Sequence, residues 1–126
     1  MNDNRDETFL LVNSILEGVF EKKGEHVVKL DMRELENSVC DYFIICHAAS
    51  GTQVDSIAES VSFTVKKKTG ELAHHKEGLD NCLWVLIDYT NVVVHIFREE
   101  QRNFYNLEAL WADAESEVVE DKVNFE

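Results

Sequence analysis

The chain has 126 residues, about the size of one domain, and 44% of them are hydrophobic, which argues for one hydrophobic core and against wholesale disorder. The 25 Asp and Glu residues outnumber the 12 Lys and Arg residues, so the formal net charge is −13. Direct binding to nucleic-acid phosphates is therefore not expected, because such binding depends on clustered Lys and Arg.

The cysteines and the apolar runs predict a cytoplasmic protein. Cys40, Cys46 and Cys82 are an odd number and lie in apolar runs, a pattern typical of reduced thiols rather than of a disulfide framework. No run approaches the roughly 18 consecutive apolar residues of a membrane span. The first residues, MNDNRDETF, are polar and acidic, unlike a signal or transit peptide. We therefore expect a cytoplasmic protein that does not contact membranes.

The first half of the chain alternates helices and strands. Apolar residues at helical spacing predict a helix over about residues 6–23, with Gly24 as its C-terminal cap. Weak alternation predicts a first strand over residues 26–31, and residues 32–38 form a polar connection. The unbroken apolar run at residues 42–46 predicts a central strand, because both of its faces must be covered.

A second helix is predicted after this strand. Ser50 and Gln53 have the spacing of a capping box, in which the Ser50 hydroxyl caps the helix and the Gln53 side chain returns to the Ser50 amide. Apolar residues at helical spacing then continue to Gly70. The three lysines at residues 66–68 lie where this helix should end, and cations there complement the exposed carbonyl groups. They therefore do not indicate a nucleic-acid site.

The second half of the chain predicts a hairpin and a last helix. Residues 71–73 are expected to form a short strand. Two apolar runs, residues 84–87 and 92–97, flank the polar turn at 88–91 and predict a β-hairpin. Asn103 is expected to cap the last helix. The apolar positions of that helix are Phe104, Leu107, Leu110 and Trp111.

The end of the chain differs in composition from the rest. Residues 113–126 contain six acidic residues and one lysine, which predicts a flexible, solvated tail in which Val118, Val119 and Val123 dock only loosely. Residues 1–112 are expected to form a single α/β domain, with a mixed β-sheet flanked by helices.

No metal site is expected from the histidines and cysteines. His74 and His75 are neighbours, so on a strand their side chains point to opposite faces. Cys40 and Cys46 would share a face, but at strand rise they lie about 20 Å apart. Neither spacing matches the short clusters that bind zinc.

An enzyme is not expected either. Asp41 and Asp88 are lone acids beside apolar strands, a position more typical of strand ends than of paired catalytic carboxylates. Residues 50–52 open a helix and offer backbone amides to an anion, but a single glycine there makes a phosphate site a weak prediction. Cys46 and His47 are neighbours on a strand, so their side chains point apart. We predict a protein without catalytic residues or a cofactor.

The predicted hairpin has two different faces. Alternation places an aliphatic set together with Tyr89 on one face, the expected core side. It places Trp84, Asp88, His95 and Phe97 on the other face, and aromatic anchors mixed with polar groups are typical of a recognition surface. The alternative is that helices cover this face and that His95 is a buried, hydrogen-bonded histidine. The pattern leaves both interpretations open.

Several segments together resemble the ribosomal silencing factor family, also called the iojap-related proteins. The segments are DYFIIC at residues 41–46, Val54 with SIA at 56–58, Glu77-Gly78, WVLIDY at 84–89, VVVHIF at 92–97 and YNLEALW at 105–111. They cover roughly residues 9–111 in the order and spacing of the family, and they are specific as a set.

The chain departs from the family pattern in three loops. Thr90-Asn91 stands where the family usually has Gly-Asp. The family often has a Pro before its Glu-Gly pair, but residues 72–76 contain none. His47-Ala48-Ala49 replaces a stretch that usually contains Gly or Thr. Because Asn tolerates a positive φ, we still expect the hairpin turn to close.

The resemblance implies a nucleotidyltransferase-like α/β fold that lacks the catalytic carboxylates and the phosphate loop. It implies that the protein binds a large-subunit ribosomal protein (number fourteen) at the intersubunit face and blocks joining of the small subunit, which lowers translation when nutrients are short. Organellar relatives assist large-subunit assembly, and free members are commonly homodimers. The excess of acidic residues suits a basic ribosomal partner.

On this interpretation, the hairpin and the acids after it contact the ribosomal protein, with Trp84 as the anchor and the acids steering association. The predicted contact residues are Trp84, Asp88, Tyr89, His95, Phe97, Glu99 and Glu100. The alternatives are a large-subunit assembly factor, or a nucleotidyltransferase-like enzyme in which Asp41 and Asp88 hold magnesium and residues 50–53 hold phosphate.

Overall fold

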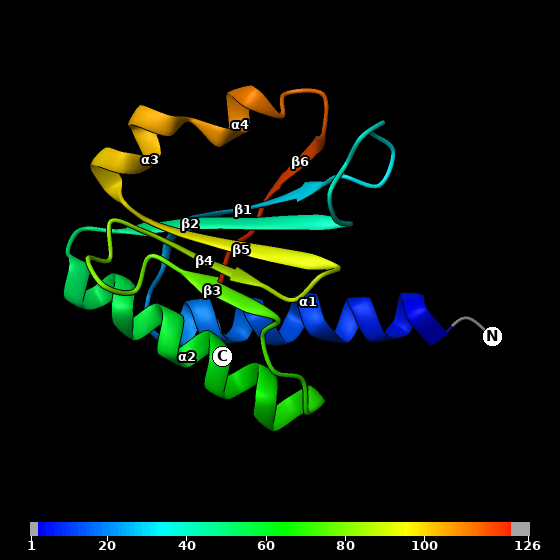
Figure 1. The fold of residues 1–126 in the computed structure, drawn as a ribbon, viewed down its shortest axis with the longest axis horizontal. Coiled ribbons are helices and arrows are strands. Elements are labelled where there is room, and N and C mark those ends of the chain that lie inside the picture. The colour runs from blue at the N-terminus through cyan, green and yellow to red at the C-terminus, as the bar shows by residue number, and fades with distance from the viewer. Residues whose placement is uncertain (1–2, 122–126) are drawn as a thin grey trace.

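A mixed six-stranded sheet carries helices on both of its faces (Figure 1). The computed structural model describes residues 3–121. The helices are α1 (Asp3–Glu21), α2 (Gly51–Thr69), α3 (Glu99–Tyr105) and α4 (Leu107–Leu110). The strands are β1 (Glu25–Asp31), β2 (Tyr42–Ala48), β3 (His75–Glu77), β4 (Trp84–Asp88), β5 (Val92–Arg98) and β6 (Glu115–Val118).

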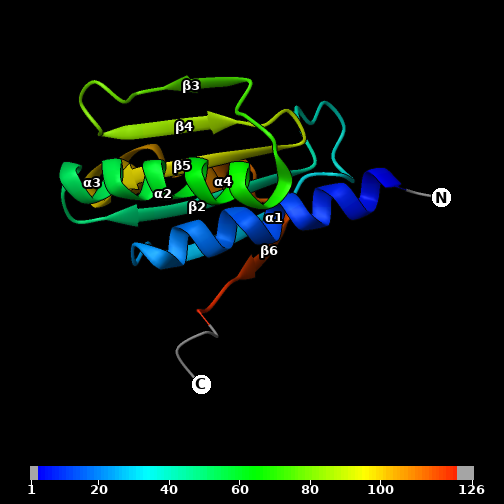
Figure 2. The same cartoon turned by 90° about the horizontal axis from the view of Figure 1, so that it is seen from below.

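The strand order accounts for the unbroken apolar runs of β2 and β5. Across the sheet the order is β3-β4-β5-β2-β1-β6, with β3 and β6 at the two edges (Figure 2). β2 and β5 pair in parallel at the centre, and the other neighbouring strands pair antiparallel. Central strands are covered on both faces, so both of their side-chain sets are apolar. The predicted α/β class, the mixed sheet and the central strand are confirmed.

The larger core lies between the sheet and the helices α1 and α2, which run side by side across one face (Figures 1 and 2). The predicted aliphatic face of the hairpin points into this core, and Tyr89 is buried there as well. The two helices approach so closely that a Cβ added at Gly18 would lie 2.7 Å from Val61 Cα. The Ser60 hydroxyl donates to the Gly18 carbonyl oxygen at 2.8 Å. Among the described helices, none is long and apolar enough to cross a membrane.

The end of α1 corrects the prediction that Gly24 is its left-handed cap. Lys23 has the positive φ, 61°, and the amides of Lys23 and Gly24 donate to the carbonyl oxygens of Phe20 and Val19, each at 3.0 Å. These two bonds form a Schellman motif. Glycine is still required at position 24, because a Cβ there would lie 2.5 Å from Val19 Cγ1.

The start of α2 confirms one half of the predicted capping box and corrects the other. The Ser50 hydroxyl accepts a hydrogen bond from the Gln53 amide at 3.1 Å, as predicted. The Gln53 side chain does not return to the Ser50 amide; its Nε2 donates to the carbonyl oxygens of Lys22 and Lys23 at 3.2 and 3.4 Å. Gln53 therefore satisfies the exposed carbonyl groups at the end of α1 and ties the two helices together. α2 ends at Gly70, as predicted, and Gly70 adopts the left-handed conformation.

Two element predictions in the second half were wrong. The short strand lies at His75–Glu77 rather than at residues 71–73. Asn103 lies inside α3 and does not cap it, because helix formation starts at Glu99, directly after β5. The single helix predicted there is two short ones, since Asn106 adopts a left-handed conformation with φ 47° between α3 and α4.

The acidic end of the chain is not wholly a solvated tail. Residues Glu115–Val118 form β6, which pairs antiparallel with β1 at the edge of the sheet. Lys29 of β1 lies 3.3 Å from Glu117, and the Val119 amide donates to the Val27 carbonyl oxygen at 2.9 Å. Lys29 and the open edge of β1 thus hold residues Glu115–Val118 in a strand, although their composition predicts a solvated tail. Val123 lies outside the described residues.

The hairpin turn closes as expected, but a different residue takes the unusual conformation. Thr90, not Asn91, has the positive φ, at 77°. The Thr90 amide donates to Asp88 Oδ1 at 2.7 Å, and the Asn91 amide donates to the Tyr89 carbonyl oxygen at 2.9 Å. The Asn91 side chain instead reaches Thr8 of α1, to which its Nδ2 donates at 3.1 Å. A β-branched residue is strained in this conformation.

We predict that Thr90→Gly raises the free energy of unfolding by about 1 kcal/mol, because glycine adopts a positive φ without the steric cost that Thr90 bears. Chemical denaturation measures the change. The matched control is Thr64→Gly in the interior of α2, which should lower the free energy of unfolding by about 1 kcal/mol. A loss of stability in both variants would contradict the assignment of strain to the turn.

Candidate docking surface on the second face of the sheet

The face of the sheet opposite α1 and α2 carries a smaller core that α3 and α4 cover (Figure 1). Phe97 is fully buried in it, and Leu107 of α4 and Ala114 pack there as well. Trp84 and Trp111 are partly buried at its margin. The two helices reach this face because β5 leads directly into α3, which returns over the sheet.

Trp84 is held in a cluster of aromatic rings. Its ring centroid lies 4.9 Å from that of Phe97 and 4.8 Å from that of Tyr105. Its Nε1 donates to His95 Nδ1 at 3.1 Å. The indole is thus fixed by stacking on both a strand and a helix and by one hydrogen bond, while part of it stays accessible.

His95 is buried beneath this cluster and is neutral at physiological pH. Its ring packs edge-on against Phe43, with centroids 4.6 Å apart. Burial lowers the pKa of His95 to about 4. Because Nδ1 accepts the Trp84 bond, the proton sits on Nε2, which has no hydrogen-bond partner among the described residues. Of the two interpretations left open by the sequence, the buried, hydrogen-bonded histidine is the one that the structure supports for His95.

The structure separates the predicted contact residues into different environments. Tyr89, His95 and Phe97 are buried, so their side chains do not face a partner in this conformation. Asp88 lies at the far end of β4 from Trp84, about 13 Å away at strand rise, and its carboxylate holds the hairpin turn. Trp84 remains accessible in part. Glu99 and Glu100 are exposed in the first turn of α3, where their charges also complement the helix dipole.

Large apolar side chains are exposed on this face, and two of them, Phe104 and Leu110, were predicted to be apolar positions of the last helix. Phe104 is 78% exposed, Leu110 is 70% exposed and Tyr105 is 48% exposed. The rings of Phe104 and Tyr105 lie 5.0 Å apart, and Tyr105 contacts Trp84. The left-handed Asn106 rotates α4 relative to α3, which turns Leu107 into the core and leaves Phe104 and Leu110 outside.

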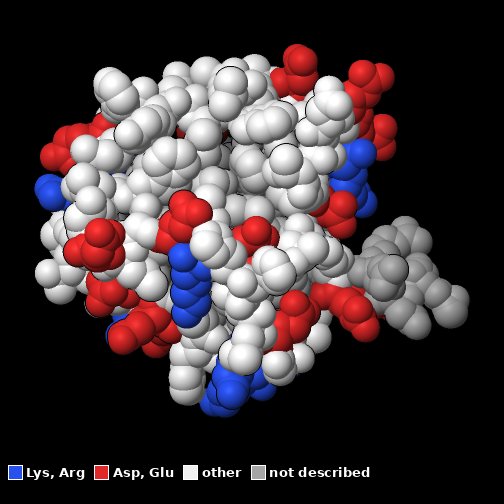
Figure 3. All heavy atoms as spheres, viewed as in Figure 1, with Lys and Arg blue, Asp and Glu red and all other residues white. Residues whose placement is uncertain are grey.

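We call Trp84, Phe104, Tyr105 and Leu110 the α3–α4 surface. Figure 3 shows that the part of the molecule over α3 and α4 carries few charged side chains and that acidic groups lie around its margin. Apolar patches with a polar rim mark interaction sites on soluble proteins. The surface offers exposed and partly exposed aromatic side chains of the kind that anchor binding interfaces.

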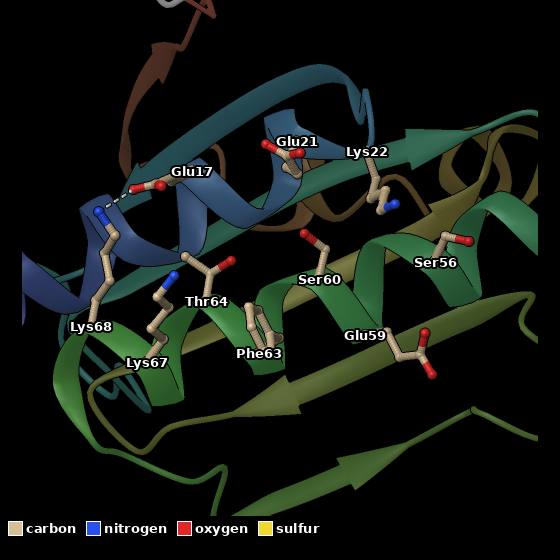
Figure 4. Close-up of a pocket in the computed structure, with 10 residues that line it drawn as sticks. All are labelled: Glu17, Glu21, Lys22, Ser56, Glu59, Ser60, Phe63, Thr64, Lys67 and Lys68. Carbon is tan, nitrogen blue, oxygen red and sulfur yellow. Dashed lines mark ion pairs between the residues drawn. The ribbon is translucent and has the colours of Figure 1, made fainter.

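A hollow lies on the other side of the molecule, in the groove between α1 and α2 (Figure 4). Its volume is about 710 Å³. Lys68 Nζ lies 3.0 Å from Glu17 Oε1, and the Lys67 ammonium lies 5.9 Å from the centre of the Phe63 ring. Two of its cations are thus already engaged by groups of the same groove, which makes it a weaker candidate than the α3–α4 surface.

The structure does not assemble the site of a nucleotidyltransferase-like enzyme. Asp41 directly precedes β2 and Asp88 ends β4, at the same end of the sheet, and β5 lies between these two strands. Ser50 lies beyond the other end of β2, about 20 Å away at strand rise, and its hydroxyl caps α2. Among the described residues, no three His, Cys, Asp or Glu side chains come together in a way that could hold a metal ion.

Comparison with known proteins gives a consistent result. A family model described as "Ribosomal silencing factor during starvation" matches residues 5–126. The chain belongs to the ribosomal silencing factor family. Curated relatives named ribosomal silencing factor RsfS include one from Bacillus subtilis, 42% identical over 94 residues, which cover 75% of this chain and 78% of that protein. Another, from Halalkalibacterium halodurans, is 38% identical over 114 residues, which cover 90% of this chain and 96% of that protein.

A solved structure supports the fold of this chain. A crystal structure from Bacillus halodurans superposes with a TM-score of 0.70 at 40% sequence identity. The superposition covers 80% of this chain and 92% of the other. The matched residues of the family model include β6, so the family region extends past residue 112 into the strand that the acidic tail forms.

We predict that acid destabilises this chain through His95. The unfolded chain takes up a proton near pH 6.5, whereas the folded chain resists protonation of His95 down to about pH 4. The stability that the neutral ring contributes is therefore complete above pH 6.5 and is lost as the pH falls towards 4, by about 2 kcal/mol at pH 4.5.

His95→Gln tests this prediction, because the glutamine oxygen can still accept from Trp84 Nε1 but does not titrate. Urea denaturation from pH 7 to pH 4.5 should show a smaller loss of stability in the variant than in the unmodified chain. Equal losses in the two proteins would mean that His95 does not carry the acid sensitivity.

Proposed function

We propose that this chain is a translational repressor that binds a basic protein of the large ribosomal subunit, ribosomal protein number fourteen, through the α3–α4 surface. Bound at the intersubunit face, it blocks joining of the small subunit by occupying the space that the small subunit needs. The effect is to lower translation when nutrients are short. No reaction is catalysed, and no cofactor takes part.

The observation that carries the proposal is the exposure of large apolar side chains on α3 and α4. Phe104, Tyr105 and Leu110 are exposed although α3 and α4 cover the smaller core. Soluble chains rarely leave such groups together in water without a partner to cover them. Tyr105 contacts the partly buried Trp84, which is a suitable anchor because rigid aromatic residues dominate binding energy at interfaces.

Charge supports a basic partner. The chain carries a net charge of −13, and acidic groups lie around the uncharged area in Figure 3. Glu99 and Glu100 stand beside the surface, at the start of α3. Complementary charge of this kind raises the association rate and excludes acidic partners. A ribosomal protein is basic because it neutralises RNA phosphates. Such a protein suits both the acidic residues that would steer association and the aromatic anchor Trp84.

The names of the relatives support a role in ribosomal silencing. The proteins from Bacillus subtilis and Halalkalibacterium halodurans bear the name ribosomal silencing factor, and the matching family is described by its role during starvation. We place this chain in the same process and in the cytoplasm, where ribosomes are found. We further propose that the free chain is a homodimer, as is common in the family.

We predict that Phe104→Ser weakens binding to large ribosomal subunits about tenfold or more, because it removes an aromatic side chain from the centre of the contact. Phe104 is 78% exposed, so the substitution should leave the free chain folded. Co-sedimentation with purified large subunits measures the affinity.

The matched control is Phe63→Ser, which removes a ring that is 68% exposed from the α1–α2 groove on the opposite side. It should bind large subunits as the unmodified chain does. If Phe63→Ser abolished binding and Phe104→Ser did not, the docking surface would be the groove instead.

We also predict that Trp84→Ala combined with Glu99→Lys abolishes co-sedimentation with large subunits, because the pair removes the anchor and reverses a steering charge. Circular dichroism should show an unchanged content of helix and strand. The same variant should no longer prevent purified subunits from joining. Undiminished co-sedimentation of a folded double variant would refute this function.

A further inference from the structure

A cation is buried beneath the α3–α4 surface. The Arg102 side chain is 7% exposed, although arginine is seldom buried without partners. Its Nη1 donates to the His26 carbonyl oxygen at 2.7 Å and lies 3.0 Å from His47 Nδ1. Its Nη2 donates to Glu108 Oε2 at 2.7 Å. The guanidinium is thus held by three groups, one of them a carboxylate.

The three partners belong to three different elements. His26 lies in β1, His47 in β2 and Glu108 in α4, whereas Arg102 itself lies in α3. The bond to Glu108 crosses the left-handed Asn106 that separates the two helices. One side chain therefore connects both helices to each other and to two strands of the sheet.

This connection matters because the helices are short. α3 has seven residues and α4 has four, well below the length of roughly 12–15 residues at which isolated helices become stable in water. Their position must come from tertiary contacts. Packing of Leu107 in the smaller core supplies an apolar contact. The hydrogen bond from Arg102 to the His26 carbonyl oxygen supplies a polar contact.

Arg102 also lies one helical turn or less from the exposed aromatic residues. Phe104 and Tyr105 follow it in α3, and Tyr105 reaches Trp84 with ring centroids 4.8 Å apart. A shift of α3 on the sheet would separate Tyr105 from Trp84 and divide the α3–α4 surface. A preformed surface binds more tightly than one that must be ordered on binding.

We propose that Arg102 is a positioning residue that fixes α3 and α4 on β1 and β2 and so holds the α3–α4 surface in the shape that the partner binds. This inference rests on the proposed function of that surface. The role requires arginine rather than any cation, since two separate nitrogens of a planar fork reach the His26 carbonyl and Glu108. Arg102 does not itself touch the partner.

The test compares Arg102→Lys and Glu108→Gln with Val61→Ala. Val61 is a fully buried residue of α2 on the opposite face of the sheet, so its truncation destabilises the fold without touching α3. Co-sedimentation with large subunits is measured well below the melting temperature of each variant. Arg102→Lys should weaken binding about tenfold or more, Glu108→Gln by less, and Val61→Ala by no more than about twofold.

Fluorescence supplies a readout that does not need the ribosome. The chain has two tryptophans, so a Trp111→Phe background leaves Trp84 as the single emitter. In that background Arg102→Lys should shift the Trp84 emission to the red, because Tyr105 no longer covers the indole. Val61→Ala should leave the emission unchanged.

The outcomes separate the two proposals. Wild-type binding and emission in Arg102→Lys, or an equal loss of binding in Val61→Ala, would overturn the positioning role. If the unmodified chain does not bind large subunits, the proposed function fails. In that case the Trp84 emission alone decides whether Arg102 positions α3.

Discussion

The buried guanidinium of Arg102 is the interaction on which the second face of the sheet depends. It joins α3 to the His26 carbonyl of β1, to the ring of His47 on β2 and to Glu108 of α4. Burial together with the neighbouring Arg102 charge lowers the pKa of His47, which keeps that ring neutral and free to accept. Two helices too short to hold themselves in place are thereby fixed on the sheet.

The two faces of the sheet are consequently built in different ways. On one face, α1 and α2 cross at Gly18 and enclose a large aliphatic core. On the other face, aliphatic side chains and the rings of Phe43 and Phe97 form a smaller core, and Phe104 and Leu110 remain exposed. The first face holds the larger core, whereas the second leaves large apolar side chains such as Phe104 exposed, the side chains that the proposed function assigns to a partner.

The sequence predicted what depends on periodicity and missed what depends on tertiary contacts. The central strand, the hairpin with its aliphatic face and the Ser50 cap follow from local pattern, and the structure confirms them. The break at Asn106 could not be predicted, because a left-handed residue in an apolar helical pattern is set by the packing of Leu107. Alternation placed Trp84 and His95 on one face correctly, but whether helices cover that face depends on this break. The strand β6 forms because β1 offers it an open edge.

The most direct test of the central claim is a cryo-electron microscopy structure of large ribosomal subunits saturated with this chain. We predict that Phe104, Tyr105 and Leu110 lie against a basic ribosomal protein at the intersubunit face, with α3 and α4 placed on the sheet as they are in the free chain. The α1–α2 groove would then face away from that protein. Density that places the chain elsewhere on the subunit, or that seats it through the α1–α2 groove, would contradict the claim.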